Sequence, residues 1–133
     1  MYIVAGDSGA VHSTVKERWA QRDPDLVRGM TLLGELAHQG VEALRKTDYK
    51  LLSTLMEKNF ETRRELYGDN VVGKTNLNMV SLATQYDMSA KFTGSGGAIV
   101  CMCNRQNNIG KWYTTAEETV IKDAFNQKGY QFE

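Results

Sequence analysis

Three glycines within four residues, Gly94, Gly96 and Gly97, separate two short runs that read as strands. Phe92 ends the first run, and residues 98–103 form the second. Glycine tolerates positive φ and allows close approach to its backbone, because it has no Cβ. The stretch predicts a tight β-hairpin, and the N–H groups of such a turn can also form an anion-binding concavity. The spacing is neither that of a Walker loop nor GxGxxG, so a plain hairpin loop and a phosphate-binding loop both stay open.

Length and charge narrow the class of protein. The 133 residues are enough for a buried core, and we expect one domain over residues 1–133. Sixteen basic residues balance sixteen acidic ones, which argues against a nucleic-acid partner. No apolar run is long enough for a membrane span, and the N-terminus lacks the features of a signal peptide. The cysteines, Cys101 and Cys103, are expected to be reduced and largely buried in a cytoplasmic protein, and they predict no metal site.

The N-terminal residues predict a strand that leads into a helix. Residues 2–9 form a short apolar run followed by a glycine-rich turn. Ser13 or Thr14 is then expected to cap a helix that begins at residue 15, or to meet a ligand phosphate at the N-terminus of that helix. His12 is interpreted as a turn residue, because no carboxylate partner or nucleophile is evident nearby.

Two long amphipathic helices are expected next. Apolar residues recur every three or four positions over residues 26–46 and again over residues 51–66, with Asp48 available as a cap between the two runs. The tight link predicts an antiparallel helical hairpin. Arg63 and Arg64, on the polar face of the second helix, are expected to lie in water or to meet an anionic ligand.

The second half of the chain predicts a mixture of helix and strand. After a connector over residues 71–74, we expect a shorter helix to about residue 86, and the glycine-rich hairpin follows. A capping box at residues 115–118 then opens a helix that Gly129 ends, and residues 130–132 alternate like a last strand. Helices on one face of a small antiparallel sheet make an α+β fold, and the last part fits a ferredoxin-like, split βαβ arrangement.

Several separated motifs together resemble one enzyme family. Residues 92–98 (Phe-Thr-Gly-Ser-Gly-Gly-Ala) look like the third signature motif of the GHMP kinases, the family of galactokinase, homoserine kinase and mevalonate kinase. Residues 7–19 and 59–68 resemble segments of the plant-type glucuronokinase branch. The resemblance covers nearly the whole chain and implies the ferredoxin-like C-terminal domain of a sugar kinase. We find no match to the family's N-terminal half, which carries a P-x-x-x-G-L-x-S-S-A nucleotide loop, the catalytic carboxylate and a helper lysine.

The resemblance implies a phosphotransferase. The intact enzyme would transfer the γ-phosphoryl group of ATP, with Mg²⁺, to the anomeric hydroxyl of a sugar, with glucuronic acid the expected substrate. The nucleotide-side residues would be Gly94, Ser95, Gly96 and Gly97, with N–H groups that can face phosphate oxygens. Without the N-terminal half, this chain is expected to be inactive alone, and it offers no residue that we would name as general base.

Further candidates lie at two places on the substrate side. Asp7, Ser8, Ser13 and Thr14 occupy the corresponding strand-to-helix segment, within plausible reach of the cleft. Lys91 is a candidate anion contact or a solvent-facing strand residue.

The expected partners are a sugar and the N-terminal kinase half. Separation from that half would expose apolar surface, so a homodimer is also expected as an outcome. The alternative function is a stand-alone, non-catalytic ferredoxin-like module that binds a small ligand or dimerises.

Overall fold

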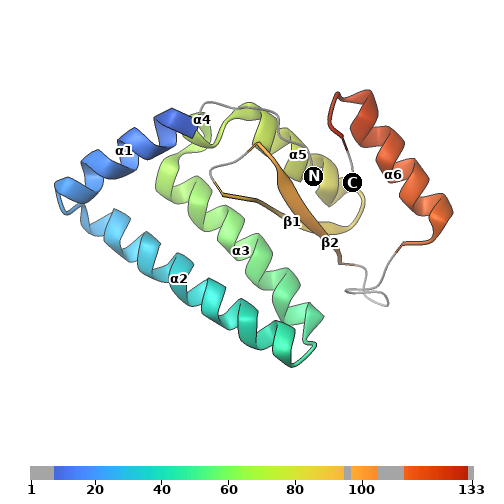
Figure 1. Cartoon of the computed structure of the whole chain (residues 1–133), viewed down its shortest axis with the longest axis horizontal. Coiled ribbons are helices and arrows are strands. Elements are labelled where there is room, and N and C mark those ends of the chain that lie inside the picture. The colour runs from blue at the N-terminus through green and yellow to red at the C-terminus, as the bar shows by residue number, and fades with distance from the viewer. Residues whose placement is uncertain (1–7, 95–96, 105–112, 132–133) are drawn as a thin grey trace.

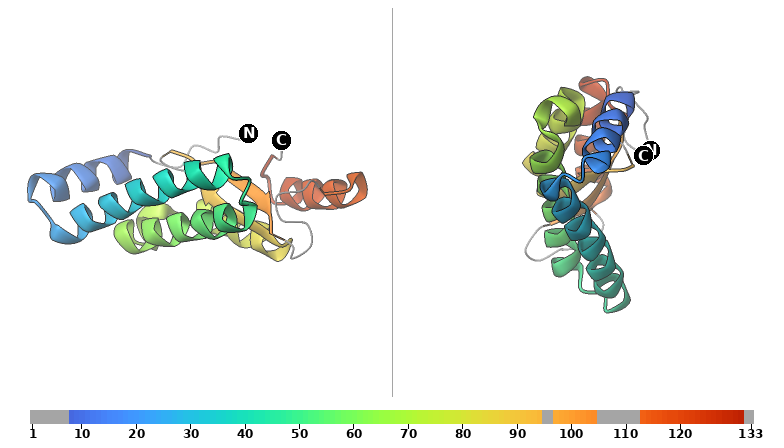
Figure 2. Two further views of the ribbon diagram at one scale, coloured as in Figure 1. Left: turned by 90° about the horizontal axis from the view of Figure 1, so that it is seen from below. Right: turned by 90° about the vertical axis from the view of Figure 1, so that its left-hand side faces the viewer.

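A computed structural model of the chain describes residues 8–94, 97–104 and 113–131, with side chains from residue 13 onward. This part of the chain is α+β, as expected: helices pack around a two-stranded antiparallel sheet (Figure 1). Its elements are α1 (Ser8–Ala20), α2 (Pro24–Arg45), α3 (Tyr49–Tyr67), α4 (Asp69–Val72), α5 (Lys74–Gln85), β1 (Met88–Phe92), β2 (Ile99–Cys103) and α6 (Thr115–Gln127). Helices α1 and α6 lie at opposite ends of the molecule (Figure 2).

The expected helical hairpin is confirmed as α2 and α3, which pack side by side. Each helix begins at an aspartate cap. The Asp23 side chain accepts hydrogen bonds from the backbone N–H groups of Asp25 and Leu26, and Pro24 occupies the first helical position, where no N–H is needed. Asp48 accepts from the N–H of Leu51 in the same manner. These caps satisfy donors that a helix N-terminus would otherwise leave unpaired.

Arg18 and Gly29 join the first three helices. The Arg18 side chain donates from Nε to Asp23 Oδ2 (2.6 Å) and from Nη1 to the carbonyl of Leu66 (2.5 Å). Gly29 on α2 lies directly against the Leu66 side chain on α3, where an added Cβ would come within 2.7 Å of Leu66 Cδ1. The absence of a side chain at Gly29 therefore sets how closely the two helices approach.

The expected β-hairpin is confirmed, with Met88 opposite Cys103 and Phe92 opposite Ile99. Strand β1 contacts both α3 and α5, so four of its five residues are buried and only Lys91 is partly exposed. The main core joins this strand to α3, α4, α5 and α6. Its buried members are Phe60, Val72, Val80, Ala83, Met88, Ala90, Phe92, Ile121 and Phe125.

Helix α1 begins earlier than the sequence indicated. It starts at Ser8, so His12, Ser13 and Thr14 lie inside it, and the predicted turn and cap at these positions are wrong. A hydroxyl side chain favours a cap, but it can also bond within a helix and does not stop one. The chain's only proline, Pro24, lies beyond the helix, so nothing in this stretch breaks it.

Three other details differ from expectation near the helix ends. The connector expected over residues 71–74 is instead divided between α4, which ends at Val72, and α5, which begins at Lys74, with Gly73 between them. The capping box sits one residue earlier, where Thr114 and Glu117 exchange hydrogen bonds. Tyr130 and Gln131 are not in a strand, because Gly129 has φ of 80° and turns Tyr130 back onto the Phe125 ring of its own helix (6.4 Å between centroids).

The four-stranded sheet of a ferredoxin-like fold is thus only partly represented. In the described residues the sheet has two strands. The predicted strand over residues 2–5, Phe132 and most of the polar loop after Asn104 lie outside them. The ferredoxin-like topology stays a prediction.

Two glycines of α2 should respond oppositely to substitution by alanine. Gly34→Ala should raise the free energy of unfolding by about 0.5–1 kcal/mol, because alanine favours the helix and nothing lies within 4 Å of the added Cβ. Gly29→Ala should give less stability than Gly34→Ala by about 1 kcal/mol or more, because its Cβ overlaps Leu66. Urea denaturation measures both. Equal stabilisation by the two changes would contradict the close α2–α3 contact.

Candidate functional site

The glycine-rich end of the hairpin is anchored by a buried asparagine of α5. Asn76, 8% exposed, accepts a hydrogen bond at Oδ1 from the Gly97 N–H (2.9 Å) and donates from Nδ2 to the Val72 carbonyl (2.7 Å). Both described glycines of the turn have positive φ, 50° at Gly94 and 87° at Gly97, which explains the choice of glycine. The Gly97 N–H already donates to Asn76 Oδ1, so a phosphate could accept from this N–H only by displacing the Asn76 side chain.

Arg63 of α3 holds the other side of the same turn. Its Nη1 donates to the Gly94 carbonyl (2.6 Å), and its guanidinium lies over the Phe92 ring, 4.8 Å from the centroid. Its Nε is buried and has no hydrogen-bond partner among the described residues. In the same part of the chain, Arg63 forms no ion pair with a carboxylate. Its charge is therefore held beside the glycines without a neutralising neighbour there.

Lys91 adds a second cation at this place. It is partly buried on β1, and its Nζ donates to the Phe92 carbonyl (3.1 Å). Burial lowers the pKa of the Lys91 ammonium below its ordinary value, and the nearby charge of Arg63 lowers it further. Two cations that repel each other beside a glycine turn would both be stabilised by an anion between or next to them.

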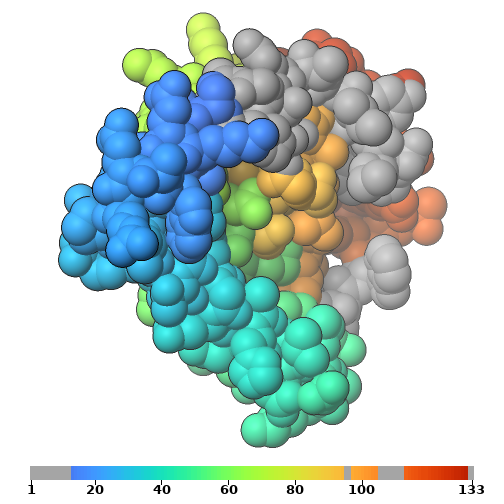
Figure 3. All heavy atoms as spheres, turned by 60° about the vertical axis from the view of Figure 1, so that its left-hand side comes forward, coloured from blue at the N-terminus to red at the C-terminus, as the bar shows by residue number. Residues whose placement is uncertain are grey.

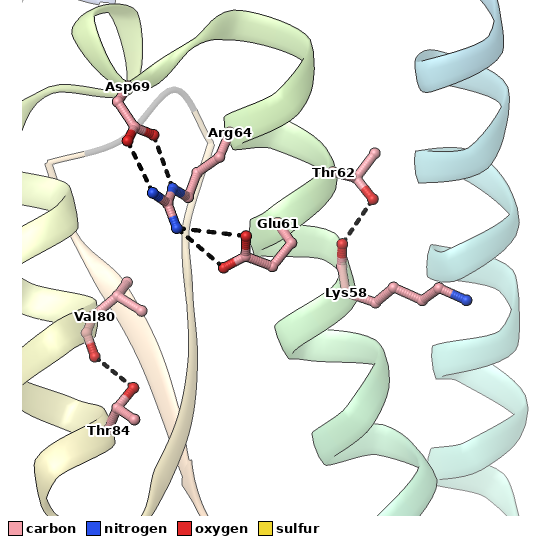
Figure 4. Close-up of polar contacts among 7 residues, drawn as sticks. All are labelled: Lys58, Glu61, Thr62, Arg64, Asp69, Val80 and Thr84. Atoms are coloured by element: carbon pink, nitrogen blue, oxygen red, sulfur yellow. Dashed lines mark hydrogen bonds and ion pairs between the residues drawn. The ribbon is translucent and has the colours of Figure 1, made fainter.

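The neighbouring Arg64 has a different role, as Figure 4 shows. It forms a two-pronged ion pair with Asp69, with both hydrogen bonds at 2.8 Å, and it also reaches Glu61. The Asp69 hydrogen bond raises the pKa of Arg64 and holds the pKa of Asp69 below its ordinary value. Arg64 thus links α3 to α4, and of the two adjacent arginines only Arg63 faces the hairpin turn.

The other predicted site residues are placed unevenly. Ser95, Gly96 and Asp7 lie outside the described residues. Ser8 begins α1, whose N-terminal end lies near α4 (Figure 1), and α4 in turn meets the hairpin through the contact of Asn76 with Val72. Ser13 lies more than one turn farther along α1, as does Thr14. The structure therefore joins Gly94, Gly97 and Lys91 directly, and relates the start of α1 to them only through α4.

A second polar cluster lies between α3 and the sheet. The hydroxyls of Ser53 and Ser89, both almost fully buried, share a hydrogen bond, and Ser89 also donates to Glu57 Oε1 (2.7 Å). Asn104, which follows β2, donates to the same oxygen (3.2 Å). The cluster fixes the hairpin on α3, and no histidine or cysteine takes part in its described contacts.

The sequence analysis did not identify Asn76 or Arg63 as an anchor of the turn. Asn76 looked like the start of a helix, and Arg63 looked like one member of a charged helix face. The signal that could have found Asn76 is a polar residue at a helical position that the apolar period places toward the core. Within the described ranges, no group of three or more His, Cys, Asp or Glu could hold a metal ion, and no helix is long and apolar enough to cross a membrane.

Removal of the Asn76 side chain should cost more than removal of a neighbour's. Asn76→Ala leaves the buried Gly97 N–H and Val72 carbonyl without their partner, so the free energy of unfolding should fall by about 1–3 kcal/mol. Asn78→Ala, at an exposed position of the same helix, should change it by less than about 0.5 kcal/mol. Urea denaturation of both variants measures the difference. Similar losses would mean that Asn76 does not anchor the turn.

Comparison with known proteins relates the sequence of this chain to two plant proteins. Over 97 residues, 73% of this chain, the sequence is 46% identical to the probable glucuronokinase 2 of Arabidopsis thaliana, of which the match covers 26%. Over 97 residues it is 43% identical to glucuronokinase 1 of the same plant, with 27% of that protein covered. No family model matches the chain, and no solved structure matches it. The predicted resemblance to plant glucuronokinases is confirmed over 73% of the chain, less than the nearly complete coverage expected, and the chain spans about a quarter of the length of the two that it matches.

Proposed function

We propose that this chain is the C-terminal, GHMP-type portion of an ATP-dependent sugar 1-kinase whose substrate is glucuronic acid. The observation that carries the proposal is the 43–46% identity to two glucuronokinases over 73% of the chain. Because the match covers about a quarter of either relative, phosphoryl transfer is proposed for the longer polypeptide. This chain contributes one wall of the site to it.

The glycine-rich turn with Arg63 and Lys91 is the anion-facing part of that wall. Phosphoryl transfer depends on positive groups that are already in place where negative charge develops. Arg63 is held in place by the Gly94 carbonyl and the Phe92 ring, so it loses little freedom when an anion binds. The anion is a phosphate oxygen of ATP or the carboxylate of glucuronic acid, and both suit a guanidinium.

The remaining requirements of the reaction lie in the rest of the enzyme. We propose that the nucleotide loop, the Mg²⁺ ligands and the catalytic carboxylate belong to an N-terminal half, as the GHMP resemblance implies. Gly94, Ser95, Gly96 and Gly97 would approach that nucleotide loop, and Asp7, Ser8, Ser13 and Thr14 would lie on the sugar side. ATP and Mg²⁺ would therefore bind only weakly, if at all, to this chain alone.

A non-catalytic module that binds a small ligand or dimerises is the second candidate. The observation that favours it is the exposure of three large apolar side chains on α2, Val27, Val41 and Leu44. Such a surface suits self-association as well as contact with another part of an enzyme.

An assay of ATP consumption tests the kinase proposal. With glucuronic acid and Mg²⁺, this chain alone should be silent, and the chain extended by its upstream reading frame should convert ATP to ADP in step with sugar phosphate. Activity of the short chain would contradict the division of the site between two halves. Silence of both across a panel of sugars would favour the non-catalytic module.

The two adjacent arginines offer a matched test of the anion-facing wall. In the extended polypeptide, Arg63→Gln should lower kcat/KM for phosphorylation by about tenfold or more, because a preorganised charge beside the anion is lost. Arg64→Gln should change kcat/KM by less than about threefold, because Arg64 is already paired with Asp69 and Glu61. Equal effects of the two substitutions on kcat/KM would overturn the assignment of Arg63.

A further inference from the structure

Helix α2 is apolar on two adjoining sides, and the described chain covers only one of them. The covered side carries Leu26, Leu36 and Ala43, all buried, and Leu36 and Ala43 pack with Leu55 of α3. Gly29 and Gly40 also belong to this side, since an added Cβ at either would meet a side chain of α3. A helix that packs against one neighbour needs an apolar stripe only about 100° wide. This side alone would meet that need.

The second side, which we call the outer face of α2, carries another apolar stripe. Its residues follow one another at alternating spacings of three and four, which keeps them in line along a helix. They are Val27, Met30, Gly34, Ala37, Val41 and Leu44. The large side chains toward the two ends of the stripe are exposed to water: Val27 is 41%, Val41 45% and Leu44 55% exposed. Helix α2 runs along the molecular surface in Figure 3.

The centre of the outer face is shaped for a helix. Gly34 and Ala37 are exposed and small, and nothing in the described chain lies within 4 Å of a Cβ placed at Gly34. Small central residues flanked by larger ones let a second helix axis approach closely while the ends interdigitate. The rest of the helix circumference is polar, with Arg28, Glu35 and Glu42. The apolar stripe therefore has polar residues beside it, and α2 is not a helix that is apolar all round.

The size of the stripe distinguishes between possible occupants. From Val27 to Leu44 it is about 26 Å long, one helix face wide. A single pair of helix faces buries less than the roughly 1,200 Å² of total surface that a stable complex of separate chains needs. A tethered segment of the same polypeptide needs much less, because its effective concentration is on the order of millimolar. The relatives have about three quarters of their length outside the matched segment, which is ample chain to supply it.

We propose that the outer face of α2 is a docking surface for an apolar-faced helix of the same, longer polypeptide. The inference depends on the proposed function only in taking the intact protein to be longer than this chain. Helix α2 would then pack between α3 on one side and a helix from the rest of the enzyme on the other. The outer face is distinct from the glycine-rich turn, whose anchors come from α3 and α5.

Thiol labelling compares the outer face in the short and the extended polypeptide. Ala37→Cys places a reporter at the centre of the stripe, and Gln39→Cys is the matched control at an exposed polar position of the same helix. The native thiols give a slow background that the unsubstituted protein measures, because Cys103 is buried and burial raises the pKa of Cys101 to about 12. The probe is a maleimide under native conditions.

In the extended polypeptide, the thiol at position 37 should react at least about tenfold more slowly than in the short chain, whereas the control thiol should react equally fast in both. Equal reaction rates at position 37 would overturn the proposal. Protection in the short chain that grows with protein concentration would overturn it too, because a second copy would then occupy the face. The phosphorylation assay is independent: an active extended enzyme with an unprotected position 37 contradicts only the docking surface.

Discussion

The contact between α3 and β1 is the one on which the rest of this structure depends. Phe60 meets the edge of Phe92 with ring centroids 5.9 Å apart, and about one and two turns earlier on α3, Glu57 and Ser53 form hydrogen bonds with Ser89. Strand β1 also contacts α5, so a two-stranded sheet that would be marginal in water is supported by helices along β1. The contacts of β1 with α3 and α5 therefore also fix the position of the hairpin turn. Arg63 lies one turn after Phe60 on α3, and because α3 and β1 are held together its side chain can reach the Gly94 carbonyl.

The burial of β1 also makes Lys91 unusual. Its four neighbours on β1 are buried, and a lysine in such a strand is costly because burial opposes its charge and Arg63 repels it. A chain selected only for stability would place an apolar or neutral residue there. Residues that lower the stability of the fold and make no compensating structural contact are commonly functional. The pairing of Arg63 and Lys91 beside a glycine turn is the strongest local support for an anion-binding role.

Local patterns in the sequence predicted most of the elements and little of the site. The period of apolar residues and the aspartate caps placed α2 and α3 correctly, and the glycines placed the hairpin, because these signals act over a few residues. The start of α1 was misplaced, since Ser13 and Thr14 are compatible with both a cap and a helix interior. The anchors of the turn lie 31 and 21 residues away from the glycines that they bind, so no local pattern encodes them. Nor did the pattern distinguish Arg63 from Arg64, because the difference comes from Asp69 beyond the end of α3.

Contact between an anion of the substrates and the hairpin turn can be observed by NMR of the isotope-labelled extended polypeptide. The signals to follow during titration with ATP–Mg²⁺ and with glucuronate are the Gly94 amide and the Nε–H groups of Arg63 and Arg64. We expect one of the two ligands to shift the Gly94 and Arg63 signals in a saturable manner, while the Arg64 signal stays in place because Asp69 holds that side chain. Saturable binding of both ligands without any change at Gly94 or Arg63 would contradict it.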